Sequence, residues 1–345
     1  MNDLKLDEKF FNKFFHEVNL GAYPESSKAE TEATLDSAIG KLWSTELERE
    51  FLVDLWLSNL IGTKPRSAII TKDELVTPHL GDSMYISKAA GLSAEGDLGT
   101  THSLKDDEEN LDLSRVMLKP SRIGNAVAFR TKLEHSLSFT LRSEVKNLLA
   151  DWAAQKIEKL IIAALENCSL ANTLLAGTSD SKENLTQTDT VQASDLLRLY
   201  VSLLESGAKG IAELGGFYCL ILHPRAWYDL SLDTTFMTAV AQASVGKTYD
   251  WEGFVGSYSH FRMFMSPLVH SQISEGSPGV NVYSAYALGA RAACIGWQKH
   301  WSWLRKGSSG DYGETDGVGT DAYCESKILN QKYLYKLQSA ATSPR

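Results

Sequence analysis

The pattern of hydrophobic and polar positions predicts one very long helix near the middle of the chain. Over about residues 136–167, apolar side chains recur every three or four positions, and no glycine or proline interrupts them. Ser136 or Ser138 can cap the start of this helix. Roughly 30 residues form a helix about 45 Å long, whereas the mean helix has about 11–12 residues.

Short strands and a long polar flap are predicted before this helix. Apolar runs at residues 68–70, 84–86, 116–118 and 126–129 are typical of strands. The stretch from Ser87 to Leu113 is polar, and it contains three glycines and an acidic run, Asp106-Asp107-Glu108-Glu109. A loop of this length is uncommon inside a compact domain. We therefore expect it to extend from the body of the protein.

An α/β block is predicted after the long helix. Its first helix is expected over 193–207, a buried strand over 216–222 ends at His223-Pro224, and one further helix covers 227–243. Residues 261–265 and 286–297 are predicted to be further strands of the same sheet. A strand within 323–337 is expected to return and pair with earlier parts of the chain.

The region before residue 68 has two parts: a segment of about 45 residues with little periodicity, and a predicted helix after it. The first 45 residues show little periodicity but carry an apolar cluster, Phe10, Phe11 and Phe14, which needs a surface to bury it. We expect an arm that packs on a neighbouring subunit. A helix opens near Ser44 and ends at Gly62, before Pro65.

Composition narrows the class of protein. The chain has 345 residues, of which 43% are hydrophobic and 22% charged, as in globular proteins. No apolar stretch approaches the roughly 18–20 residues of a membrane span, and the N-terminus carries no signal-peptide core. We expect a soluble protein that stays in the compartment where it is made, without a membrane partner.

The net charge argues against sequence-specific binding of nucleic acid, and the absence of known catalytic motifs argues against catalysis. The net charge is −9, whereas dedicated DNA-binding proteins are usually basic. The four cysteines are widely spaced, which predicts reduced, buried thiols and no metal site. The sequence has no P-loop, HExxH zinc motif or GxSxG elbow. The proline after His223 favours a structural role for this histidine at a strand-to-helix turn, and an enzyme with a site near His223 and Asp229 is the alternative.

The order of these elements resembles the major capsid proteins of tailed bacteriophages, which have the α+β Hong Kong 97-type (Johnson) fold. Four stretches are similar to the branch found in phage N-four and its relatives: residues 220–230, 251–258, 286–293 and 330–335. The resemblance implies an N-terminal arm (1–45), a peripheral-domain helix (46–67), an extended loop built as a β-hairpin (68–130), a peripheral domain with a long spine helix (131–172), an axial α/β domain (173–300) and C-terminal strands of the peripheral domain (301–345).

The resemblance also implies a function. Pentamers and hexamers of the chain would form an icosahedral head shell around double-stranded DNA, which is contacted non-specifically through its phosphates. The implied partners are other copies of the chain, a portal protein, a scaffolding protein and a decoration or cement protein. The protein would belong to the virion, be assembled in the host cytoplasm and need no cofactor. An encapsulin-type compartment shell or a tail protein is the alternative within structural proteins.

The candidate intersubunit contacts are electrostatic and apolar. We hypothesise that Asp106, Asp107, Glu108 and Glu109 face basic side chains of an adjacent subunit, such as Arg115, Lys119 or Arg122. Phe10, Phe11 and Phe14 are the apolar candidates. No catalytic, cofactor-binding or metal-binding residue is predicted.

Overall fold

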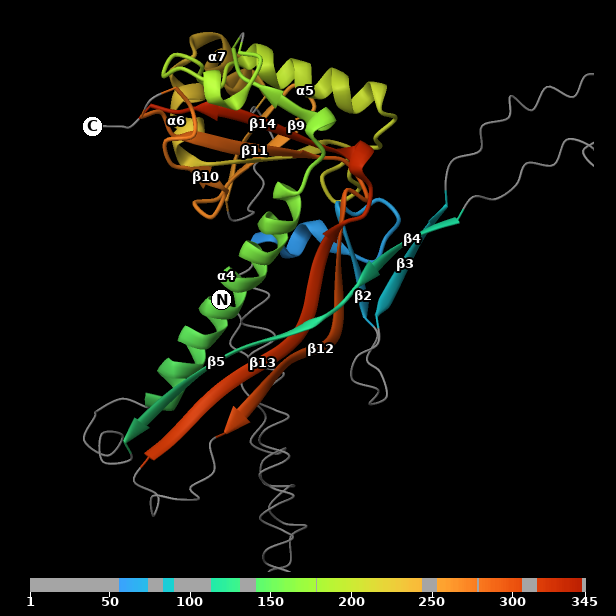
Figure 1. The fold of residues 1–345 in the computed structure, drawn as a ribbon, viewed down its shortest axis with the longest axis vertical. Helices are drawn as coiled ribbons and strands as arrows, with labels where there is room; N and C mark the ends of the chain where they lie inside the picture. The colour runs from blue at the N-terminus through green and yellow to red at the C-terminus, as the bar shows by residue number, and fades with distance from the viewer. Residues whose placement is uncertain are drawn as a thin grey trace, which may run out of the picture. The chain divides into compact units, whose positions relative to one another are not determined.

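The computed structural model describes eight stretches of the chain: 56–73, 83–89, 113–130, 141–177, 179–243, 253–277, 279–305 and 315–342. They form a five-stranded sheet, a seven-stranded sheet, a two-stranded hairpin and four α-helices (Figure 1).

The five-stranded sheet combines three long antiparallel strands with two short parallel strands at one edge. Its order is β1-β2-β12-β13-β5, and β12 and β13 run antiparallel over most of their lengths. Both the β1–β2 and the β2–β12 pairs are parallel. The 3-10 helix η1 (Trp56–Leu60) leads into this sheet, whose strands are β1 (Ile61–Gly62), β2 (Ile69–Asp73), β5 (Ser121–Arg130), β12 (Ala293–Arg305) and β13 (Thr315–Ile328).

Helix α4 (Leu141–Glu166) confirms the predicted long helix, although its predicted start lies outside the described residues. It runs along β13 (Figure 1) and packs its apolar side on the five-stranded sheet, where the Trp152 ring meets the edge of Trp301 at 5.9 Å between centroids. One core cluster joins α4 to both larger sheets, because it contains residues such as Ile157 from the helix, Cys324 from β13 and Tyr286 from the seven-stranded sheet.

The seven-stranded sheet has the order β6-β14-β11-β7-β9-β8, with β10 paired to β11. Its two central strands are buried on both faces, as the continuous apolar run at 216–222 predicted, and Tyr218–Leu222 of that run form the strand. The 3-10 turns η2 (Leu170–Asn172), η3 (Lys182–Asn184) and η4 (Gln331–Tyr333) belong to its connections. The strands are β6 (Thr173–Leu175), β7 (Tyr218–Leu222), β8 (Phe254–Tyr258), β9 (Phe261–Met265), β10 (Ser271–Gln272), β11 (Val282–Leu288) and β14 (Leu334–Ala340).

Three helices accompany this sheet: α5 (Ala193–Glu205), α6 (Pro224–Leu232) and α7 (Thr234–Ala243). Their buried side chains form a second core with the sheet. The prediction of a single helix over 227–243 was wrong. Asp233 is extended and its carboxylate accepts a hydrogen bond from the Thr235 amide at 2.9 Å, which ends one helix and caps the next.

Sheet membership also differs from the expectation. The predicted strands at 286–297 do not belong to one sheet, because the chain leaves the seven-stranded sheet after Leu288 and enters the other sheet at Ala293. Arg291 has a φ of 61° in this crossover, and its amide donates to the Ser67 carbonyl at 2.8 Å. The returning strand is β14, which pairs with β11 and β6 of the seven-stranded sheet.

Candidate assembly surfaces

The hairpin formed by β3 (Met84–Ala89) and β4 (Leu113–Leu118) is the base of the predicted flap, and the flap between them lies outside the described residues. Met84, Ile86 and Leu118 form a small core with Cys294 and Leu329 of the body. Gly296 makes this contact possible, because a Cβ atom there would lie 2.7 Å from the Leu118 side chain. The base of the hairpin therefore packs against the five-stranded sheet.

Three lysines attach the same hairpin to the rest of the chain by hydrogen bonds from their Nζ atoms to backbone carbonyl groups. Lys72 Nζ donates to the Tyr85 carbonyl at 2.7 Å, and Lys327 Nζ donates to the Met117 carbonyl at 2.9 Å. Lys88 Nζ, on the hairpin itself, donates to the Leu329 carbonyl at 3.3 Å. These bonds fix the direction in which the hairpin leaves the sheet.

Replacing Lys327 with methionine is expected to loosen this attachment. The substitution keeps an aliphatic stem but removes the donor to Met117, so hydrogen exchange of the β4 amides should show an opening free energy about 1 kcal/mol lower. Lys332→Met, at another exposed lysine, is the matched control. Unchanged protection of β4 in the Lys327 variant would show that the hydrogen bond to Met117 does not help to hold the hairpin.

The predicted basic contact residues follow one another from β4 into β5. Arg115 and Lys119 are exposed, and the Lys119 amide donates to the Glu325 carboxylate. Arg122 is already engaged within the chain, because its Nε lies 2.9 Å from the Asp321 carboxylate. The other candidates, Asp106 to Glu109 and Phe10, Phe11 and Phe14, lie outside the described residues.

Asp321 joins three strands of the five-stranded sheet. Its side chain is only 5% exposed and pairs with Arg122 of β5 and Lys299 of β12, the latter at 2.6 Å. The Ser302 hydroxyl donates to the same carboxylate at 2.6 Å. Burial alone would raise the pKa of Asp321, but the hydrogen bonds from Lys299 and Ser302 and the nearby cations outweigh it and lower the pKa.

Two glutamates of α4 fix the helix to the seven-stranded sheet and its flanking segments. Glu158 is 8% exposed and accepts hydrogen bonds from Trp56 Nε1, at 2.7 Å, and from the Ser266 hydroxyl. Glu166 accepts from the Tyr286 hydroxyl at 2.5 Å and pairs with Lys336 at 3.1 Å. Burial, reinforced by the Glu166 charge, raises the pKa of Tyr286.

His223 has the structural role that the sequence favoured. Its Nδ1 accepts a hydrogen bond from the Arg225 amide at 3.1 Å, and Pro224 occupies the first turn of α6. Burial and the neighbouring Arg225 lower the pKa of His223. Asp229 caps a different backbone group, since its carboxylate accepts from the Thr342 amide at 2.9 Å. These contacts account for both residues without a reaction.

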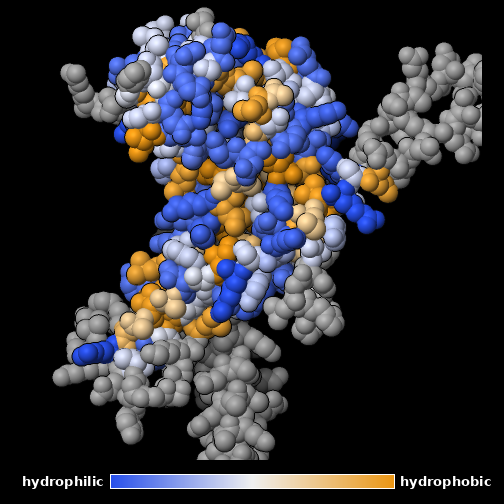
Figure 2. Space-filling view, viewed as in Figure 1, coloured by the Kyte–Doolittle hydropathy of each residue, from blue (hydrophilic) through white to orange (hydrophobic). Residues whose placement is uncertain are grey.

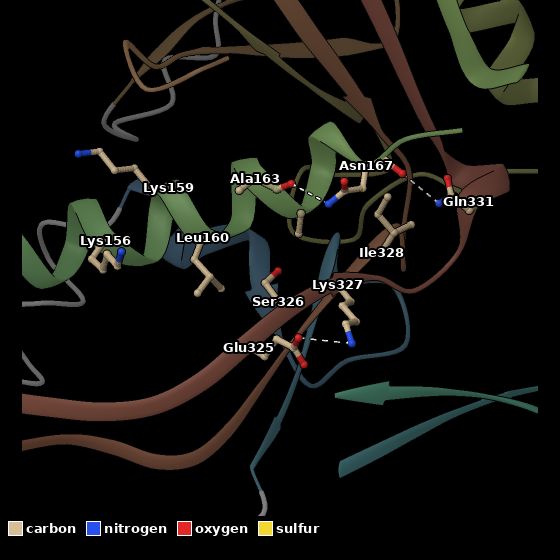
Figure 3. A pocket seen from close by; sticks show the side chains of 11 residues that line it. Lys156, Lys159, Leu160, Ala163, Asn167, Glu325, Ser326, Lys327, Ile328 and Gln331 are labelled. Atoms are coloured by element: carbon tan, nitrogen blue, oxygen red, sulfur yellow. Dashed lines mark hydrogen bonds and ion pairs between the residues drawn. The ribbon is translucent and has the colours of Figure 1, made fainter. Parts of the chain in front are cut away.

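A groove of about 730 Å³ lies between α4 and the end of β13. Figure 3 shows Leu160 of the helix pointing toward the segment that carries Ser326, whereas the Lys159 side chain points away from that segment. Sequence reasoning missed this groove, because it depends on which strand lies against the helix. The only signal in the sequence was two lysines three positions apart on the polar side of a long helix.

Large hydrophobic side chains come to the surface in several places. On the face shown in Figure 2, hydrophobic atoms form separate patches among hydrophilic ones. Among the described residues, exposed examples occur on the hairpin, on α5 and on α6 and α7: Tyr85, Leu113, Met117, Leu197, Val201, Leu204, Tyr228, Leu232 and Met237. Side chains of this kind mark a contact with a neighbour only where they form a contiguous patch, so the hairpin and the helices α5, α6 and α7 are the candidate regions.

The described side chains lack two other kinds of feature. No three histidine, cysteine, aspartate or glutamate residues gather there as they would around a metal ion. None of the described helices combines the length and apolar character that crossing a membrane requires. All four cysteines, Cys168, Cys219, Cys294 and Cys324, are free and buried, as predicted.

The fold defines the class of protein. A long helix on a sheet of long strands, an anchored hairpin and a separate α/β sheet make up the Hong Kong 97-type fold of capsid proteins. The model of the family described as phage capsid protein matches residues 140–337, which is more than half of the chain. The chain belongs to the phage capsid protein family and is a structural protein of the virion shell.

Solved structures agree on the fold. The capsid of Ralstonia phage GP4 has a TM-score of 0.71 at 17% identity, and the match covers 84% of this chain and 92% of that chain. The cyanophage Pam1 capsid has a TM-score of 0.66 at 14% identity, covering 84% and 93%. A search of the curated proteins finds no match to this sequence.

An encapsulin is similar to a lesser degree. The SrpI encapsulin complex from Synechococcus elongatus has a TM-score of 0.52 at 12% identity, and the match covers 79% of this chain and 86% of that chain. The encapsulin alternative thus shares the fold but is less similar than the two phage capsids.

Proposed function

We propose that the chain is the major capsid protein of a tailed phage, and that its pentamers and hexamers form an icosahedral head around double-stranded DNA. The family match over residues 140–337 is the observation that carries this proposal, because it spans α4, the seven-stranded sheet and the β12–β13 pair. The protein has no catalytic role in this proposal and acts through its contacts.

The proposed domain map gives each described element a place in such a shell. Residues 1–45 are the arm, and 68–130 the extended loop whose base is the β3–β4 hairpin. The helix expected within 46–67 is wrong for the described part of that range, where η1 covers Trp56–Leu60 and strand β1 covers Ile61–Gly62. Residues 131–172 contain the spine helix α4. Residues 173–300 form the axial domain, and 301–345 return to the peripheral domain. The sheet assignments favour a refinement in which 293–300 belong with the peripheral part and 334–340 with the axial part.

Stability of the shell comes from many weak contacts made at once. Each exposed apolar patch is small, but a subunit that touches several neighbours gains from all of them together. The proposed partners beyond the chain itself are a portal protein, a scaffolding protein, a decoration protein and the packaged DNA, whose phosphates are bound without base recognition. Assembly takes place in the host cytoplasm, and the product is part of the virion.

Electron microscopy of the purified full-length chain, expressed with and without a scaffolding protein, tests this proposal. We expect closed shells of uniform diameter. Tubes would indicate a tail protein, and small uniform oligomers would contradict a shell protein altogether. Closed shells that capture a cargo protein and never occur in DNA-filled virions would support the encapsulin alternative, whose specific support is the similarity to the SrpI complex.

A further inference from the structure

A small pocket lies where the turn before α6 meets the segments around β10 and β11. It has a volume of about 220 Å³ and is lined by His223, Arg225, Ser271, Ile273, Asn281 and Tyr283. Pockets for larger organic ligands have about 300–1,000 Å³ and mostly apolar walls. Ile273 is the one aliphatic side chain in this lining. The size and the walls of the pocket therefore favour a small polar ligand.

The principal hydrogen-bond acceptors of the pocket are already occupied within the chain. His223 Nδ1 accepts from the Arg225 amide at 3.1 Å, and the Tyr283 hydroxyl oxygen accepts from Arg225 Nη1 at 2.6 Å. Asn281 Oδ1 accepts from the Ser274 amide at 3.1 Å. The groups that these bonds leave over are donors: the Nε2–H of the neutral imidazole, the hydrogen of the tyrosine hydroxyl and the Nδ2 amide of the asparagine.

The guanidinium of Arg225 adds a positive charge that no described carboxylate neutralises. Arg225 is half-buried, and its guanidinium carbon lies 5.7 Å from the centre of the Tyr283 ring. No aspartate or glutamate lines the pocket. Asp229 follows one turn later on α6, but its carboxylate is buried and accepts from the Thr342 amide. Because a half-buried cation without a counter-charge is unfavourable, the pocket favours an anion.

Packed elements hold these donors in place. Ser271 of β10 and Tyr283 of β11 are directly opposite in the antiparallel ladder, so their side chains lie on one face of the sheet. Tyr283 is only 4% exposed, which limits the movement of its ring. Pro224 occupies the first turn of α6 next to Arg225. A ligand would therefore meet a largely preformed site, which lowers the entropic cost of binding.

We propose that this pocket binds inorganic phosphate or a closely similar tetrahedral oxyanion. Five donor groups line it: the Arg225 guanidinium, the His223 imidazole, the Asn281 amide and the hydroxyls of Ser271 and Tyr283. A tetrahedral oxyanion offers four oxygens to these donors, whereas a carboxylate offers two, and a planar guanidinium matches phosphate geometry. The inference goes beyond the proposed function, because this site needs no second copy of the chain.

Calorimetric titration of the purified full-length chain with sodium phosphate tests the site, at constant pH and ionic strength and without other oxyanions in the buffer. We expect one site per chain. Arg225→Gln should weaken binding at least about tenfold. Arg66→Gln makes the same change at an exposed arginine outside the pocket and should leave the affinity unchanged. Absence of binding to the natural chain, or an equal effect of the two substitutions, would overturn the proposal.

A second pair of variants tests the same site at an exposed position. Ser271 is exposed, so its replacement leaves the packed core untouched. Ser271→Glu supplies a carboxylate that competes for Arg225 and should abolish phosphate binding. Ser271→Gln has the same size without the charge and should weaken binding less than about tenfold. Equal affinities of these two variants would contradict an anion site at this place.

Other ligands identify the class of anion. Sulfate should compete with phosphate, whereas acetate should bind at least about tenfold more weakly because it has fewer acceptor oxygens. Acetate that binds as tightly as phosphate would identify a carboxylate site and overturn the proposal. A short DNA duplex that binds through Arg225 while inorganic phosphate does not would also overturn it. Each of these outcomes leaves the proposed shell function intact, since that function is tested by electron microscopy.

Discussion

Replacing Glu158 with alanine is expected to lower the free energy of unfolding by about 3 kcal/mol. The carboxylate is buried on α4 and accepts hydrogen bonds from Trp56 and Ser266. Alanine would leave two donors without their acceptor, one on the fully buried Ser266 and one on the partly buried Trp56, and each such loss costs about 1–3 kcal/mol where water cannot replace the acceptor. Denaturant unfolding of the purified full-length chain measures the effect.

Two variants separate the hydrogen bonds from other causes. Glu158→Gln keeps an oxygen acceptor of the same shape and should cost about 1 kcal/mol or less. Asp151→Ala changes an exposed acid of the same helix and should cost under about 0.5 kcal/mol. If Glu158→Ala were no worse than Asp151→Ala, then apolar packing alone would hold α4 to the Ser266 segment.

Replacing Asp321 with alanine is the second large effect that we expect, with a loss of about 2–3 kcal/mol. The carboxylate is buried and binds Arg122, Lys299 and Ser302, so its removal unlinks β5, β12 and β13. The two cations are partly exposed and regain water, which limits the cost.

The lowered pKa of Asp321 predicts that the free energy of unfolding depends on pH in the acidic range. The pKa of Asp321 is lowered in the folded chain, so the unfolded chain binds the proton more tightly. The stability that it contributes is therefore complete above the unfolded pKa of about 3.9 and is lost as the pH falls through the folded pKa. Stability measured between about pH 5 and pH 3 should fall less steeply for Asp321→Asn than for the natural chain. Equal slopes would contradict the lowered pKa.

The elements that the sequence predicted well are those whose environment repeats along the chain. The 218–222 run is apolar at every position because β7 is buried on both faces, and α4 keeps one apolar side over its whole described length. The capping role of His223 could be predicted from the proline that follows it. These signals are local, so no knowledge of partners was needed.

Pairing between distant segments was not predictable in the same way. The crossover at Arg291 contains no glycine at its positive φ, and the bond that fixes it comes from Ser67. Nothing near Ala293 therefore signals a change of sheet. The break at Asp233 is a single cap within an otherwise periodic helix pattern.

For the candidate contact surfaces too, local features could be predicted from the sequence and contacts between distant residues could not. Arg122 was predicted as a contact residue from its position beside the flap, but its partner Asp321 is distant in sequence and sits in a strand where most neighbours are buried. In the sequence, Lys156 and Lys159 are typical of the solvated side of a helix. The groove that they line exists because β13 lies against that helix. Which charged side chains meet within the chain therefore depends on tertiary pairing.

A cryo-electron microscopy reconstruction of the assembled particle tests the central claim most directly. We expect a closed icosahedral shell in which this chain forms both five-fold and six-fold rings. A particle whose shell density cannot be traced with this chain, or a chain that remains a single, self-contained subunit at every concentration, would contradict it.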